Sequence, residues 1–206
     1  MRRHKDFEFD FGNMACATFI FINMTMTIVL IGFASSGKSV TARALSKMAG
    51  LHCIDLDRVI EDAYERERGE RLTCREIYRG LGADGFSIFE NSALRSLSGM
   101  YNSVLSTGGR TPMYEPNRPL LKSLGRVAYL KCGVEAALSR MKRKGIPLSM
   151  GGTPEGVAEE WNKRDPVYAE LADVVIDNSQ ISTKETARTI LEELLKINTR
   201  NAAEKR

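Results

Sequence analysis

The sequence predicts an α/β fold, a doubly wound, mainly parallel five-stranded sheet with helices on both faces. Three observations predict it. The β-branched apolar run Thr27–Ile31 is typical of a buried strand, and the glycine-rich run GFASSGKS follows it directly. Apolar residues at helical spacing come next, at 40–49. From there, strand-like and helix-like segments alternate, which is the pattern of a parallel sheet covered by its connecting helices.

The later elements follow in chain order. Short apolar runs predict further strands at 51–55, 103–106, 127–131 and 174–176. Helical spacing predicts helices at 58–68, 74–81, 85–99, 134–144, 154–168 and 183–195, and the residues between 145 and 152 indicate a loop. Ligands of such sheets bind beyond the carboxyl ends of the strands. We therefore expect the glycine-rich run, Asp55 and the Gly108–Gly109 pair to form the site.

The run GFASSGKS matches the phosphate-binding pattern of Gly, four residues and Gly-Lys-Ser. Its glycines let the backbone curl so that N–H groups point inward, and the following helix adds a partial positive charge. Lys38 would reach the β- and γ-phosphates of a nucleotide, and the Ser39 hydroxyl would hold Mg²⁺. A chance glycine-rich turn is the alternative, and the flanking strand and helix argue against it. The predicted nucleotide-binding residues here are Gly32, Ala34, Ser35, Ser36, Gly37, Lys38, Ser39 and Val40.

Composition places the chain among ordinary globular proteins. Its 206 residues, 43% hydrophobic and 27% charged, suggest one α/β domain with room for an extension. The formal net charge of +4 fits anionic ligands, and with no basic, aromatic-interleaved stretch it does not indicate nucleic-acid binding. The four cysteines are far apart and form no CxxC pair, so we expect reduced, mostly buried thiols in a cytoplasmic protein.

We expect an N-terminal extension at 1–25, a kinase-sized domain at 26–196 and a C-terminal tail at 197–206. The apolar stretch 14–33 has a faint likeness to a membrane anchor. Acidic residues break the basic region before it, Asn23 interrupts it, and its second half is needed as the first strand. The chain is therefore expected to have no membrane partner, and we expect a monomer.

Two further patterns bear on the chemistry. The run 162–165, NKRD, fits a guanine-reading motif, but it lies in a helical run and not after a strand, so we interpret it as coincidence. Asp55 and Asp57 stand two apart on what we predict to be an extended segment, and would point to opposite sides. One could face the metal and nucleotide and the other a second substrate. The alternative is that Asp57 caps the next helix.

Taken in order, these motifs resemble the shikimate kinase family, within the nucleoside-monophosphate-kinase-like group of P-loop phosphotransferases. The resemblance covers about 27–195 and is carried by GFASSGKS, DLDRVIE, Gly-Phe followed by Glu90, STGG at 106–109, a basic helix and lid ending in Pro-Leu at 147–148, and RDPVYAELAD at 164–173. It implies a P-loop kinase architecture with a mobile lid at about 142–153. It also implies transfer of the γ-phosphoryl of ATP to the 3-hydroxyl of shikimate, with Mg²⁺.

The resemblance implies a role for each matching residue. Lys38 and Ser39 hold phosphate and metal, and Asp55 lies near the Mg²⁺. Asp57 binds the acceptor hydroxyls and is the candidate general base, so that Lys38 and Asp57 are the catalytic pair. The glycines of the Gly108–Gly109 pair let the acceptor approach the backbone. Two arginines complete the set: Arg164 pairs with the acceptor carboxylate, and Arg140 stacks on adenine.

Three positions depart from the family pattern. Ser87 replaces an arginine that binds the shikimate carboxylate, Arg110 replaces a third glycine, and Ile146 replaces a lid arginine. Our hypothesis is that Arg110 takes over the lost carboxylate contact or recognises an anion on another acceptor. A solvent-directed Arg110 is the simpler alternative. A same-fold kinase for another small hydroxylated acid, or a nucleotide-binding protein with a degenerate acceptor site, therefore stay open.

Overall fold

The computed structural model describes residues 27–141, 145–146 and 150–203. One five-stranded sheet runs through them in the order β2-β3-β1-β4-β5, and each neighbouring pair is parallel. The predicted doubly wound sheet is confirmed. The extension expected at 1–25 lies outside the described residues, as does part of the expected lid. The strands are β1 Thr27–Ile31, β2 His52–Asp55, β3 Ser103–Ser106, β4 Gly125–Lys131 and β5 Val174–Asp177.

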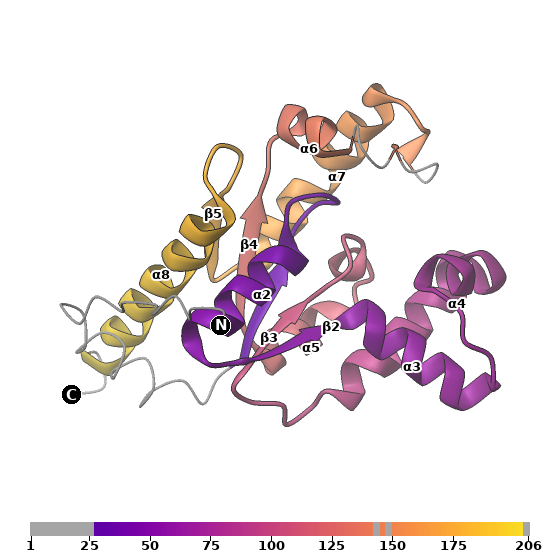
Figure 1. The fold of residues 1–206 in the computed structure, drawn as a ribbon, viewed down its shortest axis with the longest axis horizontal. Helices are drawn as coiled ribbons and strands as arrows, with labels where there is room; N and C mark the ends of the chain where they lie inside the picture. The colour runs from indigo at the N-terminus through magenta and orange to yellow at the C-terminus, as the bar shows by residue number, and fades with distance from the viewer. Residues whose placement is uncertain (1–26, 142–144, 147–149, 204–206) are drawn as a thin grey trace, which may run out of the picture.

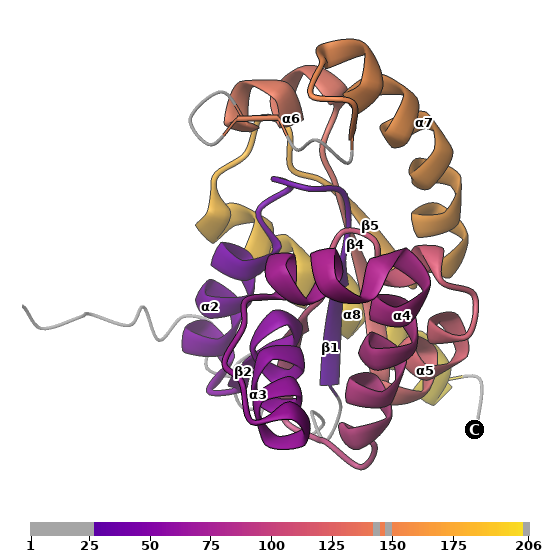
Figure 2. The same ribbon diagram turned by 90° about the vertical axis from the view of Figure 1, so that its right-hand side faces the viewer.

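Helices cover both faces of this sheet (Figure 1). Two of them pack on one face, and the others cover the opposite face or stand beyond the carboxyl ends of the strands, where α6 and the start of α7 lie above the glycine-rich loop (Figure 2). The helices are α2 Lys38–Ala49 and α8 Thr183–Ala203 on the first face, then α3 Leu56–Arg68, α4 Cys74–Ser96, α5 Asn117–Leu124, α6 Val134–Met141 and α7 Pro154–Leu171, with a 3₁₀ turn η2 at Thr111–Met113.

The central strand β1 shows why a buried strand of a parallel sheet has an almost continuously apolar sequence. Every one of its residues is buried. Ile28 and Leu30 pack with the core under α2 and α8, whereas Val29 and Ile31 pack with the core of the opposite face. Since successive side chains alternate between faces, a strand covered on both sides carries no polar face. This burial fixes the end of β1, from which the glycine-rich loop departs.

The break predicted between the helices at 74–81 and 85–99 is present. Within α4 the two helices meet at Gly82, whose φ of 71° and ψ of −176° are not helical, and the second one ends at Ser96. A glycine adopts this positive φ without a side-chain clash, so the break was visible locally but its geometry was not. Helix α8 runs on to Ala203, so most of the segment expected as a tail at 197–206 is helical.

Two short elements were missed. The 3₁₀ turn η2 and helix α5 follow the Gly108–Gly109 loop, with a proline in each. Prolines near the start of a helix are tolerated because the first N–H groups have no partner within the helix. Helix α5 packs against β1, β4 and α4, so this connection is ordered.

The cysteine expectation was partly wrong. Cys132 is buried, Cys74 is half-buried and Cys53 is exposed, and all three are free thiols. The fourth, Cys16, lies outside the described residues. Within the described part of the chain, no helix is long and apolar enough to cross a membrane.

Gly125 offers a test of the strand pairing at the centre of the sheet. A β-carbon there would lie 2.0 Å from the backbone oxygen of Thr27 on β1. We expect Gly125→Ala to lower the free energy of unfolding by about 1–3 kcal/mol, because neither backbone can move without disturbing the β1–β4 ladder. Urea denaturation measures this. Gly80 is the matched control: it is helical with open space around it, so Gly80→Ala should be neutral or stabilising by up to about 1 kcal/mol. Equal effects of the two substitutions would contradict the prediction.

Candidate active site

The loop between β1 and α2 wraps around the ammonium group of Lys38. Its Nζ donates hydrogen bonds to the backbone oxygens of Gly32 at 2.8 Å and Phe33 at 2.9 Å. The loop reaches this shape through positive φ angles at Gly32 (147°), Ser35 (61°) and Gly37 (94°). Gly32 is irreplaceable for a second reason, since a β-carbon there would lie 2.6 Å from the backbone oxygen of Leu130 on β4. The predicted phosphate loop is thus formed, with its lysine in place.

Lys38 is buried, and burial lowers the pKa of its ammonium to about 8. The charges of Asp57 and Asp55 act in the opposite direction and help keep the group protonated, whereas Arg164 lowers the pKa further. Lys38 therefore remains mainly cationic at neutral pH while carrying little hydration. Such a cation gains more from a phosphate oxygen than one on the surface.

The rest of the phosphate loop is tied to the neighbouring strand end. Asn178, just beyond β5, donates from Nδ2 to the backbone oxygen of Ser36 at 2.6 Å. The side-chain oxygens Ser36 Oγ and Asn178 Oδ1 are buried and have no hydrogen-bond partner. A hydroxyl, which can donate as well as accept, and an amide oxygen, which can only accept, are thus left unsatisfied beside a lysine and a helix N-terminus, as in a site that a polar ligand completes. Asn178 was not predicted. Its place at the carboxyl end of a strand was the available signal.

Arg140 of α6 reaches the same region from the other side. Its Nη2 donates to the backbone oxygen of Asn178 at 2.7 Å, and its Nη1 lies 3.5 Å from the backbone oxygen of Ser35. It also contacts the Cys132 thiol at 3.2 Å. The structure thus places Arg140 beside the phosphate loop, and its stacking on adenine stays a prediction. Val40, in contrast, is 45% exposed on α2, so its side chain faces solvent.

The predicted metal ligands lie at adjoining strand ends. The Ser39 hydroxyl lies 3.2 Å from the hydroxyl of Ser106 at the end of β3, and Asp55 at the end of β2 is paired in register with Ser106. In the described part of the chain, no three His, Cys, Asp or Glu residues cluster as a metal site. One hydroxyl and one carboxylate fit Mg²⁺, which keeps several waters and binds mainly through nucleotide phosphates. These residues could hold Mg²⁺ that arrives with a nucleotide and neutralise phosphate charge there.

The interpretation of Asp55 and Asp57 as neighbours on one extended segment was wrong. The strand ends at Asp55, which is the N-cap of α3: its Oδ1 accepts a hydrogen bond from the backbone N–H of Asp57 at 3.2 Å. Asp57 therefore lies in the first turn of the helix. It keeps contact with solvent, yet lost hydration raises the pKa of its carboxyl, and the charge of Asp55 adds to this. A carboxylate with a raised pKa is a stronger base than a surface aspartate.

The loop after β3 brings the acceptor candidates against the phosphate loop. A β-carbon at Gly109 would lie 3.3 Å from the backbone nitrogen of Ala34, and one at Gly108 would lie 3.8 Å from Asp57 Oδ1. The Tyr168 hydroxyl of α7 donates to the backbone oxygen of Gly109. Glycine at 108 and 109 thus lets this loop pack closely against the phosphate loop and Asp57.

Arg164 is a buried arginine. Its side chain is 3% exposed, is ion-paired with Glu160 one turn earlier on α7, and stacks over the Phe33 ring at 5.4 Å. Arg110, on the acceptor loop, is exposed, and the structure gives its guanidinium no ion pair among the described residues. Burial raises the pKa of the Tyr168 phenol, and the positive charges of Arg164 and Arg110 both act against that rise.

The guanine-reading interpretation of 162–165 finds no support in the geometry. Asp165, its last residue, accepts hydrogen bonds from the Tyr129 hydroxyl at 2.6 Å and from Lys131 Nζ at 3.1 Å. The motif lies within α7. Its acidic residue ties that helix to β4 and is not directed at a ligand.

Comparison with known proteins decides the family. A sequence model described as "SKI: Shikimate kinase" matches residues 34–195 of the chain. The chain belongs to the shikimate kinase family. A shikimate kinase of Methylococcus capsulatus is 35% identical over 84% of this chain and 94% of its own length. A solved shikimate kinase from Acinetobacter baumannii, in complex with shikimate, superposes with a TM-score of 0.74 and 33% identity over 86% of this chain and 97% of its own. The shikimate kinase of Aquifex aeolicus gives 0.68 and 28% identity, over 84% and 99%.

As a member of this family the protein is a P-loop kinase. The structure shows what occupies two of the three positions that depart from the family pattern, Ser87 and Ile146. The Ser87 hydroxyl donates to the backbone oxygen of Ala83 at 2.9 Å, so it is satisfied within α4 and supplies no charge. Ile146 packs against the hydrophobic core. Its neighbours at 142–144 and 147–149, within the expected lid, lie outside the described residues. Neither Ser87 nor Ile146 can act as the arginine that the family pattern has there.

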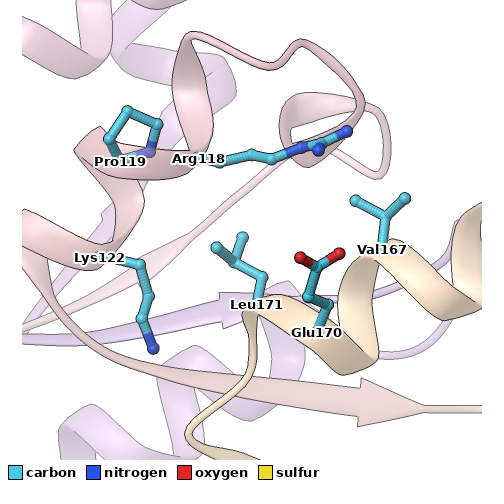
Figure 3. Close-up of a pocket in the computed structure, with 6 residues that line it drawn as sticks. All are labelled: Arg118, Pro119, Lys122, Val167, Glu170 and Leu171. Atoms are coloured by element: carbon cyan, nitrogen blue, oxygen red, sulfur yellow. The ribbon is translucent and has the colours of Figure 1, made fainter.

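A separate hollow lies between α5 and α7 (Figure 3). Arg118, Pro119 and Lys122 line it from α5, and Val167, Glu170 and Leu171 line it from α7. Its cations are engaged: Lys122 Nζ lies 2.8 Å from Asp173, and Arg118 Nε donates to the backbone oxygen of Pro112 at 3.0 Å. The side chains that line this hollow therefore hold α5 and the 3₁₀ turn η2 in place. None of them belongs to the kinase site.

Replacing Lys38 tests the phosphate site directly. We expect Lys38→Met to weaken ATP binding about 10- to 100-fold, since a hydrogen bond to a charged group contributes roughly 1.5–3 kcal/mol. The fold should survive with a lower free energy of unfolding: two hydrogen bonds to the buried residues Gly32 and Phe33 are lost, but methionine fills the space of the lysine side chain. Isothermal titration calorimetry measures the affinity. The control is Lys184→Met, which replaces an exposed lysine in the first turn of α8. This variant should bind ATP as the wild type does. Unchanged affinity in Lys38→Met would exclude the lysine from the nucleotide site.

Proposed function

We propose that this protein transfers the γ-phosphoryl group of ATP to the 3-hydroxyl of shikimate, with Mg²⁺. One observation carries the proposal: the acceptor loop meets the phosphate loop at the carboxyl edge of the sheet, where Gly109 abuts Ala34 and Gly108 adjoins Asp57. A small acceptor seated there would have its hydroxyl between a carboxylate and the γ-phosphate. The names of the relatives and the shikimate bound by the Acinetobacter baumannii enzyme support shikimate as that acceptor.

The proposed mechanism relies on position and charge. Phosphoryl transfer asks little covalent chemistry of the protein, so the chain must align the acceptor and neutralise the phosphates. Lys38 holds the β- and γ-phosphates, while Ser39 and Asp55 are suited to Mg²⁺, which neutralises the same oxygens when bound. Asp57 orients the acceptor hydroxyl and takes its proton. The raised pKa of Asp57 favours this role because it makes the carboxylate a better base.

The acceptor carboxylate would be bound by two arginines. Arg164 lies between Glu160 and the Phe33 ring, and Arg110 extends from a loop whose backbone oxygens accept hydrogen bonds on both sides of it, at Gly109 from Tyr168 and at Thr111 from Asn117. Since Glu160 already balances the charge of Arg164, Arg110 supplies the additional positive charge that an anionic acceptor needs. Adenine stacking by Arg140, lid closure over 142–153, a monomeric state and a cytoplasmic location stay predictions.

The decisive assay is ADP release from Mg-ATP with and without shikimate. We expect shikimate-dependent turnover of about 1–100 s⁻¹. Asp57→Asn should lower kcat by about 10²- to 10⁴-fold and leave ATP affinity intact, because it removes the base and not the phosphate site. No stimulation by shikimate, with ATP still bound, would overturn the proposed acceptor. Other hydroxylated carboxylic acids are then the next to assay, since Ser87 and Arg110 alter the acceptor side.

Arg110→Gly tests the second arginine. We expect the KM for shikimate to rise about 10- to 100-fold with little change in the KM for ATP, because one charge-assisted contact of roughly 1.5–3 kcal/mol is lost. Arg188→Gln, which removes an exposed arginine from α8, is the charge-matched control and should behave as the wild type. If Arg110→Gly keeps the wild-type KM for shikimate, the side chain is a solvated surface charge.

A further inference from the structure

The acceptor loop rests on a buried carboxyl group that the proposed mechanism does not use. Glu90, in the second part of α4, is 4% exposed. Its Oε1 accepts a hydrogen bond from the Thr111 hydroxyl at 2.6 Å, and its Oε2 accepts one from Asn117 Nδ2 at 3.0 Å. Asn117 Nδ2 also donates to the backbone oxygen of Thr111 at 2.9 Å. Glu90 thus holds the end of the acceptor loop directly through the Thr111 side chain, and Asn117 links it to the Thr111 backbone.

The orientation of this network is fixed. Asn91 donates from Nδ2 to Asn117 Oδ1 at 2.9 Å, which leaves the amide nitrogen of Asn117 directed at Glu90. Both groups facing the carboxyl are therefore able to donate. An ionised carboxylate can accept both hydrogen bonds, and charge-assisted hydrogen bonds are shorter and stronger than neutral ones. The 2.6 Å contact with Thr111 is of this short kind.

The same carboxyl adjoins the catalytic side of the loop. A β-carbon at Gly108 would lie 3.5 Å from Glu90 Oε1 and 3.8 Å from Asp57 Oδ1. Glu90 and Asp57 therefore both lie close to Gly108, one of the two glycines proposed to let the acceptor approach the backbone. Tyr168 fixes the other end of the segment through Gly109.

We propose that Glu90 is a positioning residue of the acceptor site, whose carboxylate, bound to Thr111 and Asn117, holds the loop 108–111 in the shape that accepts the substrate. The inference rests on the proposed function for the identity of that substrate. The inference extends the proposed function by naming a residue that contacts neither substrate nor nucleotide and still affects the affinity for the acceptor through the loop.

The charge on this carboxylate is sensitive to pH near neutrality. Burial raises the pKa of Glu90 to about 7, against the two hydrogen bonds that lower it. The charged or titratable groups that face it are Asp57 of α3, which raises this pKa, Arg110 of the loop, which lowers it, and the neutral thiol of Cys74 at the start of α4. From α5 it meets the neutral amide of Asn117. We therefore expect acceptor binding to strengthen as pH rises through about 7.

Stability should change in the opposite direction. The pKa of Glu90 in the folded protein lies above its ordinary value near 4.5, so the folded state binds the extra proton between those two values. Ionising Glu90 then costs folding stability, a cost absent below about pH 4.5 and complete above about pH 7. The protonated form of Glu90 therefore favours folding, whereas the ionised form is expected to favour acceptor binding. A purely structural role would not produce these opposite pH dependences.

The experiment compares the wild type with Glu90→Gln. Glutamine can accept from Asn117 and donate to the Thr111 hydroxyl, so the variant imitates a permanently protonated Glu90 and should fold. We expect its KM for shikimate to be about tenfold higher at pH 8, to approach the wild-type value near pH 6, and to lack a transition near pH 7. At pH 8 the variant should unfold at the same or a higher temperature than the wild type, and its ATP affinity should be unchanged.

Thr111→Val gives an independent arm. It removes one hydrogen bond that lowers the pKa of Glu90, so the pH midpoint of the shikimate KM should shift upward. Thr186→Val is the matched control: Thr186 is equally buried, bonds within α8 to the Ser182 backbone, and should leave the midpoint in place. An unshifted midpoint in Thr111→Val, or a wild-type shikimate KM in Glu90→Gln at pH 8, would overturn the inference.

Hydrogen exchange separates this inference from the proposed function. At pH 8, backbone amides of 108–113 should exchange faster in Glu90→Gln than in the wild type, whichever acid is the acceptor. Absent shikimate turnover with faster loop exchange would overturn the acceptor identity and keep the positioning role. Shikimate turnover with unchanged exchange and unchanged KM would keep the function and overturn the positioning role.

Discussion

The kinase site depends on one constraint, the wrapping of the loop 32–37 around the buried ammonium of Lys38. The two hydrogen bonds from Nζ to Gly32 and Phe33 fix a backbone whose positive φ angles are unfavourable for most residues. The sheet makes this possible, because β1 is packed on both faces and delivers the loop to one position between β3 and β4. The groups proposed to bind Mg²⁺ and acceptor are then arranged around the same lysine.

The phosphate loop was predictable because its determinants are local, whereas Asn178, which ties this loop to the end of β5 from 142 residues away, was missed. Strand, glycine loop, lysine and helix follow one another within residues 27–49, and each carries its own signal in composition or periodicity. The bounds of β1 and the end of α2 at Ala49 could therefore be predicted from this segment alone. Asp55 also fell in the predicted place, although its capping of α3 turned Asp57 onto the helix and away from the extended geometry expected.

The acceptor half was only partly predictable because its determinants are distant in sequence. Glu90 is 21 residues from Thr111 and 27 from Asn117, and the Tyr168 contact with Gly109 spans 59. Sequence patterns identified Gly108, Gly109, Arg110 and Arg164 through resemblance, but gave no sign that Glu90 is buried. A lone glutamate on a helix is usually a solvated charge. Only the packing of α4 against α5 and the loop turns it into a buried acceptor.

The electrostatics of the acceptor side explain why the position of Arg110 matters. Asp57 and the ionised form of Glu90 bring two negative charges next to Gly108, while Glu160 balances Arg164. With serine at 87, a carboxylic acid entering this pocket would meet a surplus of like charge unless another cation faced it. Arg110 is the acceptor-loop cation, and its charge already lowers the pKa of Glu90. A guanidinium on the loop supplies the missing charge from the side that Glu90 holds in place. The loss of an arginine from α4 and the gain of one at 110 are therefore best understood as one electrostatic change: the cation has moved onto a segment whose shape depends on a carboxylate that titrates near neutrality.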